Sequence, residues 1–149
     1  VAACDMAISV DTAFYCLSEV KLGLIPATIS PYVIRAMGAR ASHRWFLTAE
    51  VIEAGEAWRI GLVHELAPLD ELDAAVNAIL GHLVQAGPLA LGQAKRLIRD
   101  VAGREIDDAL GDETARRIAE VRASAEAQEG IAAFFAKRPA AWVPSQEGQ

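Results

Sequence analysis

Residues 2–32 read AACDMAISVDTAFYCLSEVKLGLIPATISPY, and this stretch decides the fold of the first part of the chain. Residues 6–10 and 13–17 are short runs of apolar, β-branched and aromatic side chains. The turn-forming pair Asp11-Thr12 separates them, so we expect two short strands. Ser30 followed by Pro31 is a typical helix start, and this helix is expected to stop at Gly38.

Beyond residue 38 the pattern is mainly helical. Residues 39–47 and 54–60 predict short helices, the second ended by Gly61, and residues 63–66 predict a strand. In residues 70–86 the apolar side chains repeat with the helical period, which predicts a helix with one buried face. Further amphipathic helices are expected from Pro88 to Gly103, over 105–127 and over 126–136.

Composition narrows the class of protein. The chain has 149 residues, 53% of them hydrophobic, which favours one domain with a core that needs no disulfide staples. Its net charge of −6 argues against non-specific nucleic-acid binding. Because no apolar run reaches the length of a membrane span and no leader opens the chain, we expect a soluble, cytoplasmic protein that binds no membrane. Val1 in place of Met indicates a piece of a longer chain.

Common site motifs are missing from the sequence. There is no glycine-rich phosphate loop, nucleophile elbow or HExxH pattern, and the histidines lack metal-ligand spacing, so we propose no metal. Cys4 and Cys16 lie among apolar residues without a neighbouring His or Lys, and we expect buried, inert thiols. One local feature stands out, since Lys21, Arg35, Arg40 and Arg44 fall in a stretch without an acid that could face an anion.

Blocks along nearly the whole chain resemble the crotonase family, the enoyl-CoA hydratases and isomerases. Residues 2–32 are similar to the family's ACD, strand and E-x-K-L-G-L-I-P run, and residues 46–66, FLTAEVIEAGEAWRIGLVHEL, are similar to its helix, turn and GLV strand. Residues 128–142, QEGIAAFFAKRPAAW, resemble its C-terminal signature. The run IPATISPY is most similar to bacterial methylglutaconyl-CoA hydratase-like members, because many other members have glycines there.

The resemblance implies an α/β fold, the crotonase-like spiral of ββα turns, of which this chain matches only the later part. The chain should therefore be mainly α with a few short strands. Residues 1–68 would end the spiral core, residues 69–142 would form a helical C-terminal region that builds a trimer, and residues 143–149 would be a disordered tail. The family's oxyanion hole and most of its CoA site would lie upstream of Val1.

Glu19 is the candidate catalytic residue. A glutamate just after a strand is ordinarily a solvated surface residue, but Glu19 matches the family's catalytic glutamate. A carboxyl group in an apolar pocket can retain its proton because desolvation disfavours the anion, so Glu19 would donate a proton to the α-carbon. Hydratases of the family carry a second glutamate, whose aligned position falls just before Val1, so hydratase and isomerase chemistry both stay open.

The resemblance also implies binding residues. Ser18 and Ala27 match substrate-lining positions, where Ala27 replaces the usual glycine and would reshape the acyl pocket. Phe134 and Lys137 match the pair that reaches the CoA nucleotide, commonly from a neighbouring subunit; without the family, Phe134 would be assigned to the core and Lys137 to a solvated face.

These expectations combine into one function. The chain would be part of a lyase that adds water across the α,β double bond of an acyl-CoA, with no cofactor beyond the CoA of its substrate, and it would assemble as a trimer or dimer of trimers. The alternatives are an isomerase of the same superfamily and a non-catalytic oligomerisation fragment.

Overall fold

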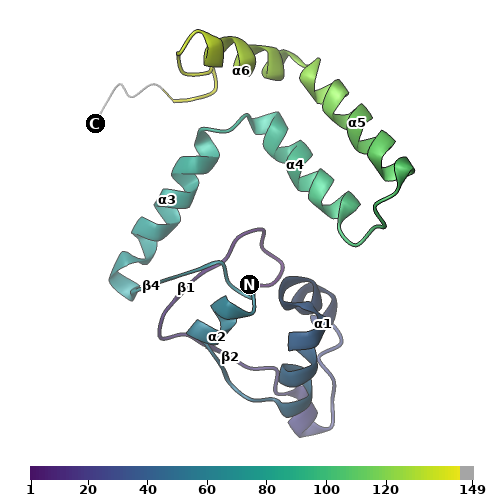
Figure 1. The fold of residues 1–149 in the computed structure, drawn as a ribbon. Coiled ribbons are helices and arrows are strands. Elements are labelled where there is room, and N and C mark those ends of the chain that lie inside the picture. The colour runs from purple at the N-terminus through teal and green to yellow at the C-terminus, as the bar shows by residue number, and fades with distance from the viewer. Residues whose placement is uncertain (145–149) are drawn as a thin grey trace. The chain divides into compact units, whose positions relative to one another are not determined.

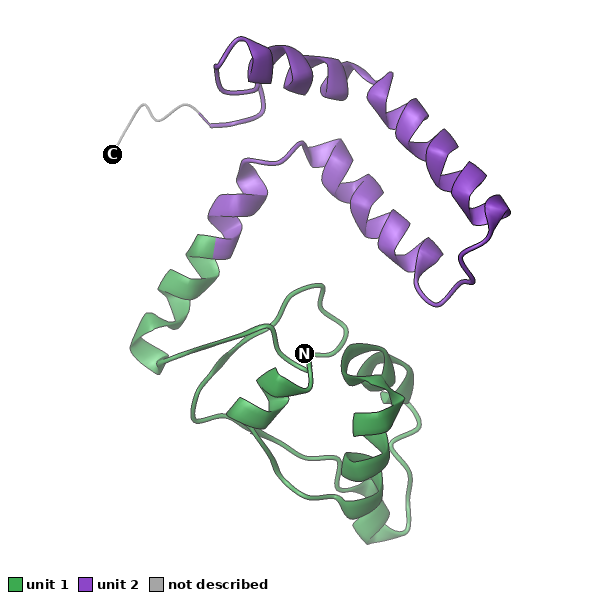
Figure 2. Cartoon of the chain, in the orientation of Figure 1, with its two compact units in different colours: residues 1–78 green, residues 79–149 purple. Residues whose placement is uncertain are grey.

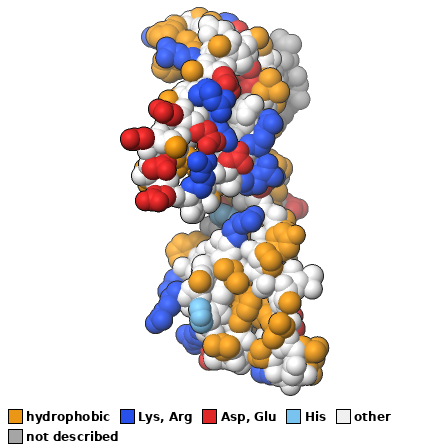
Figure 3. Space-filling view, turned by 90° about the vertical axis from the view of Figure 1, so that its right-hand side faces the viewer, with side chains coloured by type: hydrophobic (Ala, Val, Ile, Leu, Met, Phe, Trp, Pro, Cys, Tyr) orange, Lys and Arg blue, Asp and Glu red, His pale blue; other side chains and the backbone are white. Residues whose placement is uncertain are grey.

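The computed structural model describes residues 1–144, which form two compact units (Figures 1 and 2). The first unit comprises residues 1–78, and the second begins at residue 79. On the face drawn in Figure 3, hydrophobic side chains gather over the first unit, whereas acidic and basic side chains intermingle over the second. The fold is mostly helical with a few short strands, as the sequence predicts.

The strands of the first unit pair across long stretches of sequence. Strand β1 (Ile8–Val10) pairs in parallel with β4 (Glu65–Ala67), and β2 (Phe14–Tyr15) pairs antiparallel with β3 (Ile52–Glu53). Strand β3 was not predicted, because two residues are too few to show an alternating pattern. Strand β4 was predicted over residues 63–66 and lies slightly later in the chain. The unit also contains the 3₁₀ helices η1 (Glu19–Leu22) and η2 (Leu69–Glu71) and the helix α2 (Ala54–Arg59).

Helix α1 (Ser30–Thr48) contains the predicted break. Pro31 lies in its first turn, and Gly38 has φ 77° and ψ 160°, a left-handed conformation in which a side chain would be strained. The backbone leaves helical geometry at that residue, so residues 30–37 and 39–48 form two segments on either side of a kink. The expected stop at Gly38 and the second helix after it are therefore confirmed.

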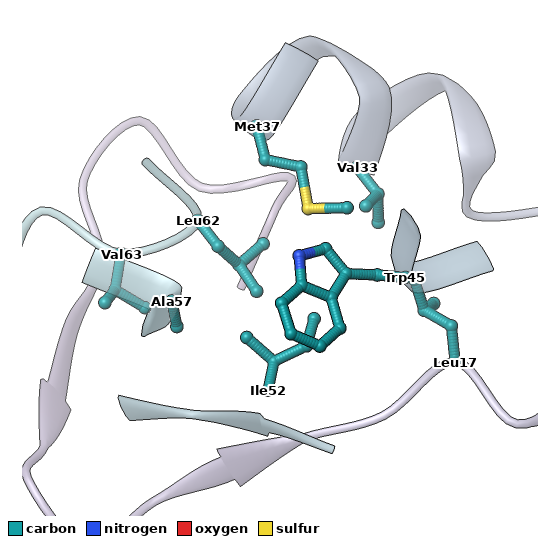
Figure 4. Close-up of a cluster of buried hydrophobic side chains, with 8 residues drawn as sticks. All are labelled: Leu17, Val33, Met37, Trp45, Ile52, Ala57, Leu62 and Val63. Carbon is teal, nitrogen blue, oxygen red and sulfur yellow. The ribbon is translucent and has the colours of Figure 1, made fainter. Parts of the chain in front are cut away.

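A cluster of buried apolar side chains holds the first unit together (Figure 4). In Figure 4 the indole of Trp45 lies at its centre, with Met37 on one side and Ile52 on the other. Trp45 is 5% exposed and Ile52 1%. The cluster consists of Leu17, Val33, Met37, Trp45, Ile52, Ala57, Leu62 and Val63. It joins α1 to the segments around β2, β3 and α2, and it thereby fixes the loop that follows β2.

The second unit consists of helices. Helix α3 (Leu72–Val84) crosses the boundary between the units, and α4 (Pro88–Val101), α5 (Asp108–Arg122) and α6 (Ala125–Phe135) follow it. No residue of α3 is fully buried, so its predicted buried face is half-buried at Leu72, Ala75, Ile79 and Leu83 and exposed at Val76 and Leu80. The expectation that α3 has one buried face is therefore wrong for this chain.

The long helix expected over 105–127 is also wrong in its extent. Helix α5 starts later because Asp107 caps it, its carboxylate accepting the N–H of Leu110 at 2.8 Å. It ends at Arg122, since Ser124 caps the next helix by accepting the N–H of Ala127 at 3.2 Å. A serine within an otherwise helical pattern thus starts a new helix.

The chain after α6 folds back over that helix. Arg138 donates to both carboxylate oxygens of Glu129, at 2.7 and 2.8 Å, and the Ala141 N–H donates to the same carboxylate at 2.9 Å. The Trp142 indole N–H donates to the carbonyl of Gln85 at 3.2 Å. The Val143 N–H donates to the Ala140 carbonyl at 3.0 Å. The disordered tail expected over 143–149 stays a prediction, and its residues 145–149 lie outside the described residues.

The hydrogen bonds of the Glu129 carboxylate predict that the protein loses thermal stability in acid. Hydrogen bonds from Arg138 and from the Ala141 N–H lower the pKa of Glu129 from 4.5 to about 2. A carboxyl group whose pKa is lower in the folded state stabilises that state above its unfolded pKa, and this contribution disappears as the pH falls through the folded value. We expect Glu129→Gln to lower the thermal midpoint at neutral pH, with a difference from the wild type that shrinks between about pH 4.5 and pH 2.

The measurement is thermal unfolding at a series of pH values. Glu120→Gln is the matched control, because it removes only an exposed ion pair with Arg116 within α5. If the difference between Glu129→Gln and the wild type is independent of pH, the ionised Glu129 carboxylate does not stabilise the turn.

Candidate active site

The candidate site is built on the loop that follows strand β2. Leu17 is 8% exposed and belongs to the buried cluster, so it anchors the chain immediately before η1. Glu19 is the first residue of η1. Its backbone carbonyl accepts the N–H of Leu24 at 3.0 Å, which closes a tight turn through Gly23 at φ 72°. The catalytic candidate is therefore held by its own loop and by the core.

The carboxylate of Glu19 has one unsatisfied oxygen. Its Oε2 atom is buried and has no hydrogen-bond partner among the described residues. A buried polar atom without a partner destabilises the fold by about 1 to 3 kcal/mol, so each such atom needs an explanation, and a catalytic role is one of them. An oxygen in this state can exchange a proton with a substrate or an ordered water. This feature distinguishes Glu19 from the exposed, ion-paired glutamates of the chain.

Ser18 and Ala27 lie on the same loop as Glu19. Both are exposed, and Ser18 precedes η1 without using its hydroxyl as a helix cap. Ala27 follows the buried Pro26, and its carbonyl accepts the hydroxyl of Ser30 at 2.9 Å. The structure thus brings these predicted binding residues onto one loop with the catalytic candidate. Their role in binding substrate stays a prediction.

The other predicted binding residues lie at the end of α6, in the second unit. Phe134 is 77% exposed, so the reading of Phe134 as a core residue is wrong. Its ring packs edge to face on Phe135, with centroids 5.7 Å apart. Lys137 is exposed and has φ 51°, and its N–H donates to the Phe134 carbonyl at 3.2 Å. A left-handed residue therefore terminates the helix and carries the lysine beyond it.

An apolar cleft of about 310 Å³, which no sequence pattern indicated, lies in the first unit. Its lining residues include Tyr15, Cys16, Ile29, Tyr32 and Met37.

The expectation of buried thiols is wrong, because Cys4 and Cys16 are both exposed. Apolar neighbours along the sequence do not guarantee burial when the chain is irregular, as it is around Cys4.

The predicted cationic stretch is partly neutralised. Arg44 donates to Glu50 at 2.9 Å and lies over the ring of Trp45, 4.4 Å from its centroid. The hydrogen bond from Arg44 lowers the pKa of Glu50 below its ordinary value. Glu50 lies just beyond the acid-free stretch, so the tertiary structure supplies the acid that the local sequence lacks.

Within residues 1–144, no group of three or more His, Cys, Asp or Glu side chains is placed to hold a metal ion. No single helix there is long and apolar enough to cross a membrane, although the bent pair Leu69–Val84 and Pro88–Val101 passes together on length and composition alone.

Short strands are followed by a series of helices, and the loop that leads from β2 to α1 carries a glutamate with an unsatisfied oxygen. An enoyl-CoA hydratase structure from Shewanella pealeana is 45% identical, with a TM-score of 0.89 over 95% of this chain and 52% of its own. The family model of enoyl-CoA hydratase/isomerase matches residues 1–145. The chain belongs to the enoyl-CoA hydratase/isomerase family.

Curated relatives agree with this assignment. An enoyl-CoA hydratase of Alternaria alternata is 38% identical over 135 residues, which cover 88% of this chain and 44% of the relative. A crotonyl-CoA hydratase of Syntrophomonas wolfei is 32% identical over 141 residues, which cover 94% of this chain and 54% of the relative. The chain spans about half the length of these relatives.

Proposed function

We propose that this chain, joined to the family's first half, forms an enzyme that adds water across the α,β double bond of an acyl-CoA thioester. This joined form is called the whole protein below. The observation that carries the proposal is the buried, unpartnered Oε2 of Glu19 in a chain of this family. A hydration assay on a panel of enoyl-CoA thioesters tests it.

Glu19 is the proton donor in this proposal. Hydration places a hydroxyl on the β-carbon and a proton on the α-carbon, while negative charge builds on the thioester oxygen. Glu19 gives its proton to the α-carbon, the proton released by the attacking water restores the Glu19 carboxyl group, and backbone amides of the family's first half stabilise the oxyanion. An isomerase instead moves a proton between two carbons without adding water. Formation of the shifted alkene in place of the hydroxyacyl product would favour that alternative.

The proposed substrate class is that of methylglutaconyl-CoA. It rests on residues 25–32, IPATISPY, which includes Ala27 on the loop of Glu19. A methyl group at residue 27 removes space that glycine would leave for the acyl chain. Ala27→Gly is expected to relax selectivity between branched and straight acyl groups; unchanged relative kcat/KM values across the panel would remove Ala27 from the pocket.

We also propose a cytoplasmic homo-oligomer, a trimer or a dimer of trimers. The support is the apolar surface that the helices of the second unit leave exposed, including Leu89 and Ile98 on α4 and Ile118 on α5. Scattered exposed apolar residues are common, but an assembly interface would cover a group of them. Light scattering of the whole protein tests the oligomeric state.

Lys137 is expected to contribute to binding of the CoA nucleotide. An exposed charge pair contributes only about 0.2 to 1 kcal/mol and is screened by salt. Lys137→Ala in the whole protein should therefore raise KM for the acyl-CoA about two- to fivefold, leave kcat nearly unchanged and flatten the salt dependence of KM. Steady-state kinetics at several salt concentrations measure these effects.

A truncated substrate supplies the control for Lys137. A pantetheine thioester has the same acyl group and lacks the nucleotide, so Lys137→Ala should have no effect on its KM. Lys95→Ala, a lysine of α4, is a matched loss of charge elsewhere in the second unit. An equal effect of Lys137→Ala on both substrates, or none on either, would show that Lys137 does not meet the nucleotide.

A further inference from the structure

The N-terminus of α4 is capped by a residue from another helix. The residue before α4 is Gly87, which has no side chain that could accept hydrogen bonds from the first N–H groups of α4. The N–H of Leu89 donates to Oε2 of Glu126 at 3.0 Å, and the N–H of Ala90 donates to Oε1 at 2.8 Å. Glu126 lies in the first turn of α6. A carboxylate at this position satisfies unpaired amides and interacts favourably with the helix dipole.

Gly87 leaves the space that this contact needs. A Cβ atom at residue 87 would lie 2.5 Å from Oε1 of Glu126, so a side chain there would displace the carboxylate. Helix α6 does not need Glu126 for its own cap, because Ser124 accepts the N–H of Ala127. The carboxylate of Glu126 therefore joins two helices.

A second contact joins the residues around the start of α4 to the region of α6. Trp142, which follows α6, donates its indole N–H to the carbonyl of Gln85 at 3.2 Å. The indole packs closely over Gly130 of α6, where an added Cβ would lie 2.9 Å from the ring. Residues 85–90 thus hold both the first turn of α6, through Glu126, and the chain that follows α6, through Trp142.

We propose that Glu126 is a positioning residue that orients α6 so that its far end can meet the CoA nucleotide. The inference rests on the proposed function, in which Phe134 and Lys137 contact CoA. Helix α6 has 11 residues, about 16 Å at the helical rise, so a small tilt at Glu126 displaces Phe134 and Lys137 relative to a bound ligand. Glu126 acts without touching the substrate.

The test compares Glu126→Ala in the whole protein with acyl-CoA and pantetheine substrates. We expect KM for the acyl-CoA to rise about three- to tenfold, since both contacts at the end of α6 weaken, and KM for the pantetheine thioester to stay unchanged. Asp107→Ala is the matched control, because it also removes a carboxylate that caps a helix of the second unit, but this carboxylate caps α5 locally and does not join two helices. It should lower the thermal midpoint and leave both KM values unchanged.

A double variant separates positioning from capping. In the Glu126→Ala background, Gly87→Ser places a local cap at the start of α4, in the space that the carboxylate has left. We expect the thermal midpoint to recover while KM for the acyl-CoA stays raised, because the link to α6 is still missing. Recovery of both quantities would show that Glu126 only caps α4, and it would overturn the inference.

The remaining outcomes are also decisive. If Lys137→Ala raises KM and Glu126→Ala does not, the positioning role is wrong while the proposed CoA contact stands. If neither Lys137→Ala nor Phe134→Ala changes KM, the CoA contact fails and the positioning role fails with it. Equal KM changes with both substrates for Glu126→Ala would indicate general loss of structure and would also overturn the proposal.

Discussion

Replacing Glu19 by Gln in the whole protein is expected to lower kcat by about 10² to 10⁴, the usual contribution of a general acid. The amide has nearly the same shape as the carboxyl group but cannot transfer the proton. Oε2 of Glu19 has no hydrogen bond to lose, so the substitution breaks no contact of that atom among the described residues. Binding of the thioester and the thermal midpoint should therefore change little.

Three measurements check this result. Steady-state turnover gives kcat, binding of an unreactive thioester gives the affinity, and exchange of the α-proton with deuterated solvent reports the transfer assigned to Glu19. Glu50→Gln is the matched control, because Glu50 is exposed and bonded to Arg44 in the same unit. Near-normal turnover of the Glu19→Gln variant would remove Glu19 from the mechanism.

The second large effect concerns residues 1–149 by themselves, which we expect to show no detectable hydratase activity. By the family resemblance, both amides of the oxyanion hole belong to segments that residues 1–149 do not match. Loss of one oxyanion donor costs about 10² to 10³ in kcat, and here both would be missing together with most CoA contacts. Exposed apolar side chains such as Leu22, Leu24 and Ile25 should also promote aggregation.

The experiment compares two samples. One is purified residues 1–149, with its mass verified, and the other is the same residues co-expressed with a segment that corresponds to the first half of the family's fold. We expect turnover only in the second sample. The Glu19→Gln version of the co-expressed sample controls for contaminating hydratases of the host. Robust turnover by residues 1–149 alone would contradict the assignment of the oxyanion donors to the first half.

The helical elements were predictable where the signal is local. The start of α1 at Ser30 and its kink at Gly38 follow from the conformational preferences of the residues at those positions. Two separate helices were predicted for α5 and α6, but the ends of α5 were misplaced, although Asp107 and Ser124 are good cap residues. Apolar residues continue past these ends, so the helical pattern obscured the caps.

The candidate site also has features that the sequence indicated and features that only the packing decided. Glu19 could be singled out only by its resemblance to the family's pattern, because a glutamate after a strand is ordinarily solvated. The burial of its Oε2 and the exposure of Phe134 depend on packing between segments distant in the sequence. Periodicity could not have shown either, since a helical pattern describes one helix and not what covers it.

The sequence by itself determined the order of most helices and the break at Gly38, because these depend on residues within a few positions of one another, and it singled out Glu19 only through the family resemblance. Only the tertiary structure decided the partners of the strands, the unsatisfied oxygen of Glu19 and the cap that Glu126 places on α4. The Ala90–Glu126 bond joins residues 36 apart in the sequence. Such contacts depend on how separate elements pack, and no local pattern specifies that packing.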